Sequence, residues 1–203
     1  MSKLRLNFVL VYCVFAFCIM ILSSCKKDST SSIPFQGPKN GSFETTDSWF
    51  VTYSAWSGTY NGVSSASLVS GTGFLPSNGI WYARLASYNV FSAPDATIYQ
   101  DNVDLSHSGT ITFDYTFSGT LGAGGGTATA YILFTSNGTQ TLWTKIMDNT
   151  NPPPVQKLNE TISLPATSST GRLTIKLSIT GGQQGSTGTQ TNVVFGIDNI
   201  RVK

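Results

Sequence analysis

The sequence predicts an all-β protein: a single antiparallel β-sandwich of the jelly-roll type that follows a cleaved signal peptide and a flexible tether. Three observations predict this fold. Apolar and polar residues alternate in several short runs, and this period of two is that of a half-buried strand. Clusters of Gly, Asn, Pro and Ser separate the runs, and no stretch has the spacing of an amphipathic helix. The part after the tether has no cysteine, so the packing of two sheets has to stabilise it without disulfides.

The N-terminus has the layout of a signal peptide. Lys3 and Arg5 precede an apolar stretch from Phe8 to Leu22, and its length of about 15 residues is short of the roughly 18 needed to span a bilayer. The run Leu22-Ser23-Ser24-Cys25 and the polar tract after it resemble the lipobox of bacterial lipoproteins. The resemblance implies cleavage before Cys25, acylation of its thiol and of the new N-terminus, and attachment to a membrane through lipid. Because Lys26 and not Asp follows the cysteine, we expect the outer membrane; the alternative is an uncleaved anchor helix.

Processing changes the composition of the folded chain. Cys13 and Cys18 are removed and Cys25 carries lipid, so no thiol is left for a disulfide, a metal site or a nucleophile. The loss of Lys3 and Arg5 reduces the 12 Lys and Arg to ten, which equals the 10 Asp and Glu. A neutral chain has no general electrostatic attraction to nucleic acid, so we expect no nucleic-acid partner.

Composition also sets the expected domain boundaries. Residues 25–39 are rich in Ser, Thr and Pro and too poor in apolar residues to offset the entropy cost of ordering. Residues 40–203 have a normal length for one domain with a sizeable core. We therefore expect a signal peptide at 1–24, a lipidated cysteine and tether at 25–39, and one β-domain at 40–203.

The alternating runs place the expected strands. They lie at 81–85, 96–103, 110–118, 128–135, 160–164, 172–179 and 193–202. In the last run the apolar residues change from odd positions, ending at Ile197, to even positions, beginning at Ile200. A β-bulge at Asp198-Asn199 produces such a change of register, and we expect it to turn the carboxylate of Asp198 out of the strand.

Motifs along the domain resemble those of one family. The opening run 40–44, Asn-Gly-Ser-Phe-Glu with Trp49 after it, and the closing run 195–202, Phe-Gly-Ile-Asp-Asn-Ile-Arg-Val, resemble the first and last strands of galactose-binding-like jelly rolls, which include many carbohydrate-binding modules. The segment 96–113, with Gln100 at the family's Gln position, is similar to the central hairpin. The resemblance implies a domain that binds carbohydrate.

The same resemblance implies a structural calcium ion. In the family a first-strand Glu and a last-strand Asp share such an ion, and the matching residues here are Glu44 and Asp198. Calcium takes oxygen ligands, and backbone carbonyls of the Asn40-Gly41 turn could complete the set. Asn199 replaces a second Asp of the family. The alternative is that both carboxylates are solvated or bonded to backbone amides.

Aromatic residues suggest where sugar would bind. Trp56 and Tyr60 lie in a run rich in Ser, Gly and Thr without alternation, which indicates a loop. Tyr82 and Arg84 have the opposite parity to the apolar residues of their strand, so we expect them on an outer sheet face. An exposed ring can stack on a pyranose while an arginine bonds its hydroxyls. We therefore expect these four residues to bind carbohydrate; packing within the core or a loop is the alternative for each ring.

Catalytic patterns are scarce. The single histidine, His107, lies in an expected exposed turn, and no strand–turn–helix setting exists for a nucleophilic serine. Asp95, Asp101, Asp104 and Asp114 are close in sequence, but we expect them to be solvated or to cap turns. We therefore expect a binding protein and not an enzyme. A structural or adhesive envelope lipoprotein that binds a protein partner fits the neutral composition equally well, and a glycoside hydrolase fits least.

Overall fold

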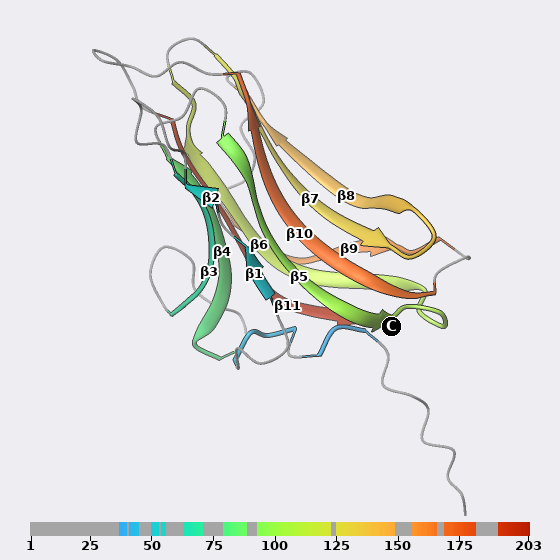
Figure 1. Ribbon diagram of the computed structural model, residues 1–203. Coiled ribbons are helices and arrows are strands. Elements are labelled where there is room, and N and C mark those ends of the chain that lie inside the picture. Colours follow the sequence, from blue (N-terminus) through green and yellow to red (C-terminus); the bar gives the residue numbers. More distant parts are fainter. Residues whose placement is uncertain are drawn as a thin grey trace, which may run out of the picture. The chain divides into compact units, whose positions relative to one another are not determined.

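The computed structural model describes residues 37–39, 41–44, 50–52, 54–55, 63–70, 79–88, 93–122, 125–148, 156–165, 169–181 and 191–203. These residues belong to one compact unit, Phe35–Lys203. The strands within them are β1 Phe50–Thr52, β2 Ser54–Ala55, β3 Val63–Ser70, β4 Trp81–Tyr88, β5 Ala93–Asp104, β6 Thr110–Thr120, β7 Thr127–Thr135, β8 Thr139–Met147, β9 Gln156–Ser163, β10 Thr170–Thr180 and β11 Asn192–Val202 (Figure 1). Across this part of the chain no helix is long and apolar enough to cross a membrane.

The strands pair into two antiparallel sheets that form a sandwich. One sheet has five strands in the order β1-β5-β10-β7-β8, and the other has six in the order β2-β3-β4-β11-β6-β9. The two C-terminal strands insert between earlier ones: β10 pairs with β5 and β7, and β11 pairs with β4 and β6. Figure 1 shows β5, β10 and β7 as long, curved neighbours. The expected fold class, an all-β antiparallel sandwich, is confirmed.

All seven expected strands are present at nearly the expected places, and two long strands were missed. Strand β3, Val-Ser-Ser-Ala-Ser-Leu-Val-Ser, is too rich in serine to show a clear apolar alternation. Strand β8 lies at the edge of its sheet and buries only Trp143 and Met147. An edge strand contributes few residues to the core, so its sequence carries little of the period-two signal.

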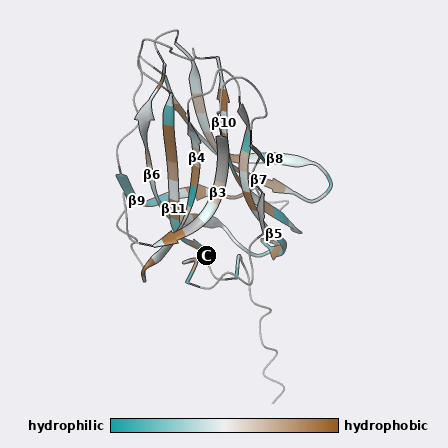
Figure 2. Ribbon diagram, turned by 60° about the vertical axis from the view of Figure 1, so that its left-hand side comes forward, coloured by the Kyte–Doolittle hydropathy of each residue, from teal (hydrophilic) through white to brown (hydrophobic). Residues whose placement is uncertain are grey.

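The core forms between the inner faces of the two sheets. Figure 2 shows hydrophobic and hydrophilic residues alternating along the strands, and on β7 and β10 every second residue is buried. The rings of Phe113 and Tyr115 meet Trp143 edge to face, with centroids 5.2 and 5.1 Å apart. Full burial of one such side chain contributes about 1.5–3 kcal/mol, and an aromatic pair adds about 0.5–1.5 kcal/mol. These rings join β6 of one sheet to β8 of the other.

Residues 37–39 and 41–44 bond to both sheets, and we call this segment the strap. Its first half follows β5. The backbone N–H of Gly37 donates to the carbonyl of Asp104 (2.8 Å). The backbone N–H of Lys39 donates to Gln100 Oε1 (2.7 Å), and Gln100 Nε2 donates to the carbonyl of Lys39 (2.8 Å). The sandwich therefore begins before Asn40, where we expected its first residue.

The second half of the strap contacts β11 and β4. The carbonyl of Gly41 accepts the backbone N–H of Ile200 (2.9 Å). A Cβ at Gly41 would overlap the carbonyl of Ile200, so only glycine allows this approach. Phe43 follows with a φ of 58° and is fully buried in the core. The described residues of the Asn-Gly-Ser-Phe-Glu motif therefore lie outside any strand, contrary to the first strand that the family resemblance implied.

Candidate functional site

The outer face of the six-stranded sheet holds two of the four residues expected to bind sugar. Tyr82 and Arg84 lie on β4 opposite to the core side, as expected, but Tyr82 is only 1% exposed. Its ring packs on Gly196 of β11, where a Cβ would come within 3.3 Å of a ring carbon. Burial raises the pKa of the Tyr82 hydroxyl, and the charge of Arg84 partly opposes this rise. The expectation of an exposed Tyr82 platform is wrong, because the ring fills the space above a glycine of the neighbouring strand.

The other two residues of that hypothesis, Trp56 and Tyr60, lie outside the described residues, and so do Cys25 and the signal peptide. Arg84 is half-buried on β4. Only Tyr82 and Arg84 of the four thus lie among the described residues, and the role of all four in sugar binding stays a prediction.

Two carboxylates meet on the outer face of the six-stranded sheet. Asp114 on β6 and Asp198 on β11 are direct cross-strand partners, and they are 1% and 0% exposed. Like charges placed opposite each other destabilise a sheet, and burial adds a desolvation cost unless hydrogen-bond donors compensate it. The expectation that Asp114 is solvated is wrong. Asp198, which we expected to be turned out of the strand, is fully buried.

A bulge near the end of β11 supplies donors for both carboxylates. The pairing of β11 with β6 shifts between Asp198 and Arg201, and Asn199 has a φ of 55°, so the expected register change at this place is confirmed. The backbone N–H of Asn199 donates to Asp198 Oδ1 (2.7 Å), and its Nδ2 donates to Asp114 Oδ2 (3.0 Å). The backbone N–H of Asn159 donates to Asp114 Oδ1 (2.6 Å). An Asp at position 199 would have no side-chain N–H to give, which explains the asparagine here.

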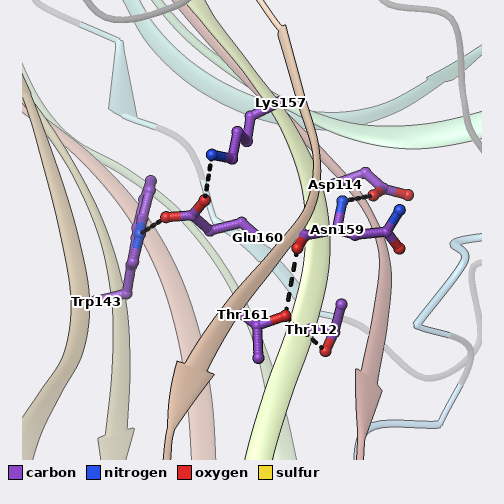
Figure 3. Close-up of polar contacts among 7 residues, drawn as sticks. All are labelled: Thr112, Asp114, Trp143, Lys157, Asn159, Glu160 and Thr161. Atoms are coloured by element: carbon purple, nitrogen blue, oxygen red, sulfur yellow. Dashed lines mark hydrogen bonds and ion pairs between the residues drawn. The ribbon is translucent and has the colours of Figure 1, made fainter.

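Strand β9 is tied to its neighbours on both sides (Figure 3). On one side Asn159 bonds to Asp114, as above. On the other side Glu160 Oε1 accepts Nε1–H of Trp143 (3.2 Å), and Glu160 Oε2 lies 3.6 Å from Lys157 Nζ. Both contacts of Glu160 are structural: the hydrogen bond to Trp143 joins the edge strands β8 and β9 of the two sheets, and the ion pair with Lys157 lies within β9.

The expected calcium ligands have protein donors in this structure. Glu44 Oε1 accepts the backbone N–H groups of Ile80 (2.9 Å) and Trp81 (3.0 Å), and Asp198 accepts that of Asn199. A calcium site needs six to eight oxygens turned toward the ion. Where side chains are described, no group of three or more Asp, Glu, His or Cys could hold a metal. These contacts fit the alternative of carboxylates bonded to backbone amides, and the calcium ion stays a prediction.

The single histidine lies in the turn between β5 and β6 and is exposed, as expected. Ser106 Oγ donates to Asp104 Oδ1 (2.6 Å) and lies 2.8 Å from His107 Nδ1. A catalytic triad has the histidine between the serine and the carboxylate, whereas here the serine is in the middle. The side-chain and backbone hydrogen bonds from Ser106 lower the pKa of Asp104. Asp104 therefore caps this turn, as we expected.

The outer face of the five-stranded sheet presents a regular polar surface, which we call the β10 face. Its residues come from neighbouring strands, and all of them are exposed or half-buried. They are Asp95, Thr97, Tyr99 and Asp101 of β5; Arg172, Thr174, Lys176 and Ser178 of β10; Thr129, Tyr131, Leu133 and Thr135 of β7; and Thr141 and Thr144 of β8.

Arg172 is the centre of one charged group on the β10 face. Its Nε and Nη2 donate to the two carboxylate oxygens of Asp101 at 2.7 and 3.0 Å, and its guanidinium lies 4.0 Å from the centroid of the Tyr99 ring. The hydrogen bonds to Asp101 raise the pKa of Arg172. The planar guanidinium suits both partners, because it bonds a carboxylate with two donors and stacks on an aromatic ring.

Lys176 is the centre of a second group with the same plan. Its Nζ lies 3.0 Å from Asp95 Oδ2 and 4.8 Å from the centroid of the Tyr131 ring. Tyr131 is the cross-strand partner of Lys176, and Tyr99 is the partner of Thr174. The two tyrosines thus lie on opposite sides of β10 and two residues apart along it, a backbone separation of about 12 Å from the usual strand spacing and rise.

Geometry and topology define this chain as a β-sandwich protein with two antiparallel sheets and a polar, tyrosine-bearing outer face. Neither the protein-family models nor the curated proteins compared with the chain match it.

Several solved structures resemble it at low sequence identity. A structure described as showing promiscuous specificity of carbohydrate-binding modules from the β-sandwich superfamily shares 13% identity at a TM-score of 0.48, over 83% of this chain and 63% of that one. A family 11 carbohydrate-binding module of a Clostridium thermocellum cellulosomal cellulase shares 14% at 0.45, over 83% and 95%. A cleaved adhesin domain of Lys-gingipain from Porphyromonas gingivalis shares 16% at 0.44, over 81% and 95%.

The β10 face was not predicted from the sequence. The signal for it is parity: Tyr99 and Tyr131 each alternate with buried residues, as do the polar residues of β10. Parity indicates that each of these side chains points away from the core, but it does not indicate which strands are neighbours in the sheet. The assembly of two tyrosines around β10 depends on pairing between strands far apart in the sequence.

Proposed function

We propose that this chain is a lipid-anchored protein of the outer membrane whose sandwich binds carbohydrate, without catalysis, on the β10 face. The observation that carries the proposal is the pair of partly exposed tyrosines, Tyr99 and Tyr131, set among hydroxyl and carboxylate groups on one sheet face. The anchor rests on Cys25 and the lipobox-like run before it. Several acyl chains on one protein anchor it stably, where a single chain is marginal.

The chemistry of the face suits a hydroxyl-rich ligand. Tyrosine offers an apolar ring for the C–H groups of a sugar and a hydroxyl at its tip. The threonine hydroxyls donate and accept hydrogen bonds. The side chains of Asp95 and Asp101 are each 40% exposed, and their carboxylates can accept hydrogen bonds from sugar hydroxyls. The cations packed on the rings hold them in place, which lowers the entropy cost of binding.

The size of the face favours an oligosaccharide over a single sugar. The tyrosines are about 12 Å apart along the sheet surface by strand geometry, so a ligand that touches both must contain several sugar units. Open, hydrated sites of this kind bind weakly. We expect dissociation constants from micromolar to millimolar, or about 4 to 8 kcal/mol.

The test is affinity gel electrophoresis of the full-length protein in non-ionic detergent. The gels contain soluble neutral polysaccharides, one in each: hydroxyethyl cellulose, xyloglucan, mixed-linkage β-glucan, galactomannan or dextran. We expect retardation by at least one of them and no new reducing ends after incubation with it. Tyr99→Ala and Tyr131→Ala should each weaken retardation while the melting temperature stays close to that of the wild type.

Two further variants locate the site. Leu158→Ala is the control, because Leu158 is 51% exposed on β9 of the other sheet and should bind as wild type does. Trp56→Ala tests the loop predicted from the sequence. If Trp56→Ala abolishes retardation and the two tyrosine variants do not affect it, the site is at that loop and not on the β10 face. Wild-type migration unchanged by every polysaccharide would remove the carbohydrate proposal itself.

A further inference from the structure

The charges of the β10 face come in matched pairs. The side chains of Arg172 and Asp101 are 45% and 40% exposed, and those of Lys176 and Asp95 are 26% and 40% exposed. Each cation therefore has its own carboxylate at a similar depth, and the four formal charges of the face cancel. A surface built from two cations on tyrosine rings would attract anions strongly if these carboxylates were absent.

We propose that Asp95 and Asp101 act as a charge gate that keeps polyanionic glycans off the β10 face and leaves it open to uncharged ones. The proposal rests on the carbohydrate-binding function proposed above and deepens it, because it states which class of polysaccharide the face excludes. The polyanions concerned carry sulfate or carboxylate groups along the chain.

The gate works by occupation and by repulsion. Asp101 uses two donors of Arg172, so a sulfate or uronate would have to displace it to make the same bidentate contact. Asp95 likewise pairs with Lys176, with its Oδ2 3.0 Å from the Nζ of the lysine. A polyanion that approaches either cation also meets the paired carboxylate, and such a repulsive element gives discrimination that attraction alone cannot. A neutral glycan pays no such cost, since it can bond to both members of each pair.

The gate can be removed without unfolding the domain. Exposed ion pairs contribute little to stability, about 0 to 1 kcal/mol each. Asp95→Asn and Asp101→Asn keep the side-chain size and remove the negative charge. We expect both variants and their combination to melt close to the wild-type temperature while the face becomes positive.

Dextran sulfate is the probe, because it has the backbone of neutral dextran with anionic sulfate esters on its hydroxyls. The full-length protein in non-ionic detergent is run in affinity gels with each polymer at low salt. We expect no retardation of the wild type by dextran sulfate and retardation of the double variant Asp95→Asn/Asp101→Asn, with an apparent affinity about tenfold higher or more from two freed cations. The gain in affinity for dextran sulfate should disappear at about 0.5 M NaCl, where exposed charges are screened.

Two controls separate the gate from a general change of net charge. Asp104→Asn removes one negative charge on the same strand, as Asp95→Asn and Asp101→Asn each do, but Asp104 bonds to Ser106 and not to a cation, so it should gain nothing. Asp101→Asn/Arg172→Gln removes the freed cation and should lose the gain of Asp101→Asn alone.

The gate is overturned if the wild type binds dextran sulfate as tightly as the double variant, or if Asp95→Asn and Asp101→Asn each gain no more than Asp104→Asn. These outcomes are read on a polyanion. They can therefore be distinguished from failure of the proposed function, in which no neutral polysaccharide retards the wild type.

Discussion

Replacement of Asn199 by Asp is expected to destabilise the sandwich strongly, although it changes a single group of the side chain. Asn199 has a φ of 55°, a conformation that Asp accepts about as well as Asn, so the backbone is not the cause. The variant loses the Nδ2 hydrogen bond to Asp114, worth about 1.5–3 kcal/mol because the acceptor is charged. It also places a third carboxylate beside Asp114 and Asp198, both of which are buried.

The repulsion can be estimated from distance. Asn199 Nδ2 lies 3.0 Å from Asp114 Oδ2. Two unit charges about 4 Å apart repel by about 4 kcal/mol at an effective dielectric constant of 20, and relaxation will remove part of this. We therefore expect Asn199→Asp to lower the free energy of unfolding by about 3–5 kcal/mol at pH 7. That is about a fifth or more of the stability of an ordinary domain, about 5–15 kcal/mol.

Urea unfolding at pH 7 and at pH 4 is the assay, with Asn102→Asp as the matched control. Asn102 also has a positive φ, 59°, but its side chain is exposed, so its replacement should change stability by less than about 0.5 kcal/mol. The loss in Asn199→Asp should shrink at pH 4, where the new carboxyl can carry a proton and donate it to Asp114. Equal stabilities of the two variants at pH 7 would refute the assignment of Asn199 as a required donor.

Three other predictions follow from the sequence and the structure. Cys25→Ala should move the protein from the membrane fraction to the soluble fraction; a variant that stays as membrane-bound as wild type contradicts lipidation. Calcium at 100 times its dissociation constant should add about 2.7 kcal/mol to stability, seen as a higher melting temperature than in chelator and lost in Asp198→Ala; equal midpoints would remove the ion. Hydrogen bonds from Ser106 lower the pKa of Asp104, so this contribution to stability is present above the unfolded-state pKa and is lost as the pH falls through the lowered folded-state pKa. Ser106→Ala should raise the pKa of Asp104 in an NMR titration, and an unchanged pKa would show that another group lowers it.

Periodicity predicted most of the sandwich but little of its polar chemistry. The strands β6 and β10 were found because core residues alternate along their length, and the bulge of β11 was found because the parity of Ile197 and Ile200 differs. Local patterns of this kind need no knowledge of strand order. Strand β8 was missed because only two of its residues are buried.

The site residues depended on contacts that the sequence does not contain. Tyr82 has the parity of a surface residue, yet it is buried, and its ring packs on Gly196 of the neighbouring strand. Asp114 lies among threonines and is buried because Asn159 and Asn199, on two other strands, both donate to it. Parity reports which side of a strand a residue occupies. Exposure on that side depends on residues supplied by neighbouring strands.

The strap has a mechanical consequence if the protein is attached to a membrane through Cys25, as proposed. Any pull on residues before the sandwich enters the described domain at Gly37, which bonds to β5, and then passes to Gly41, which bonds to Ile200 of β11. The load thus reaches first one sheet and then the other, and neither β5 nor β11 is an edge strand. It also reaches the buried ring of Phe43, which has to leave the core before the strap can peel away. Such a pull would therefore have to break contacts to one sheet and then to the other before the strap comes free.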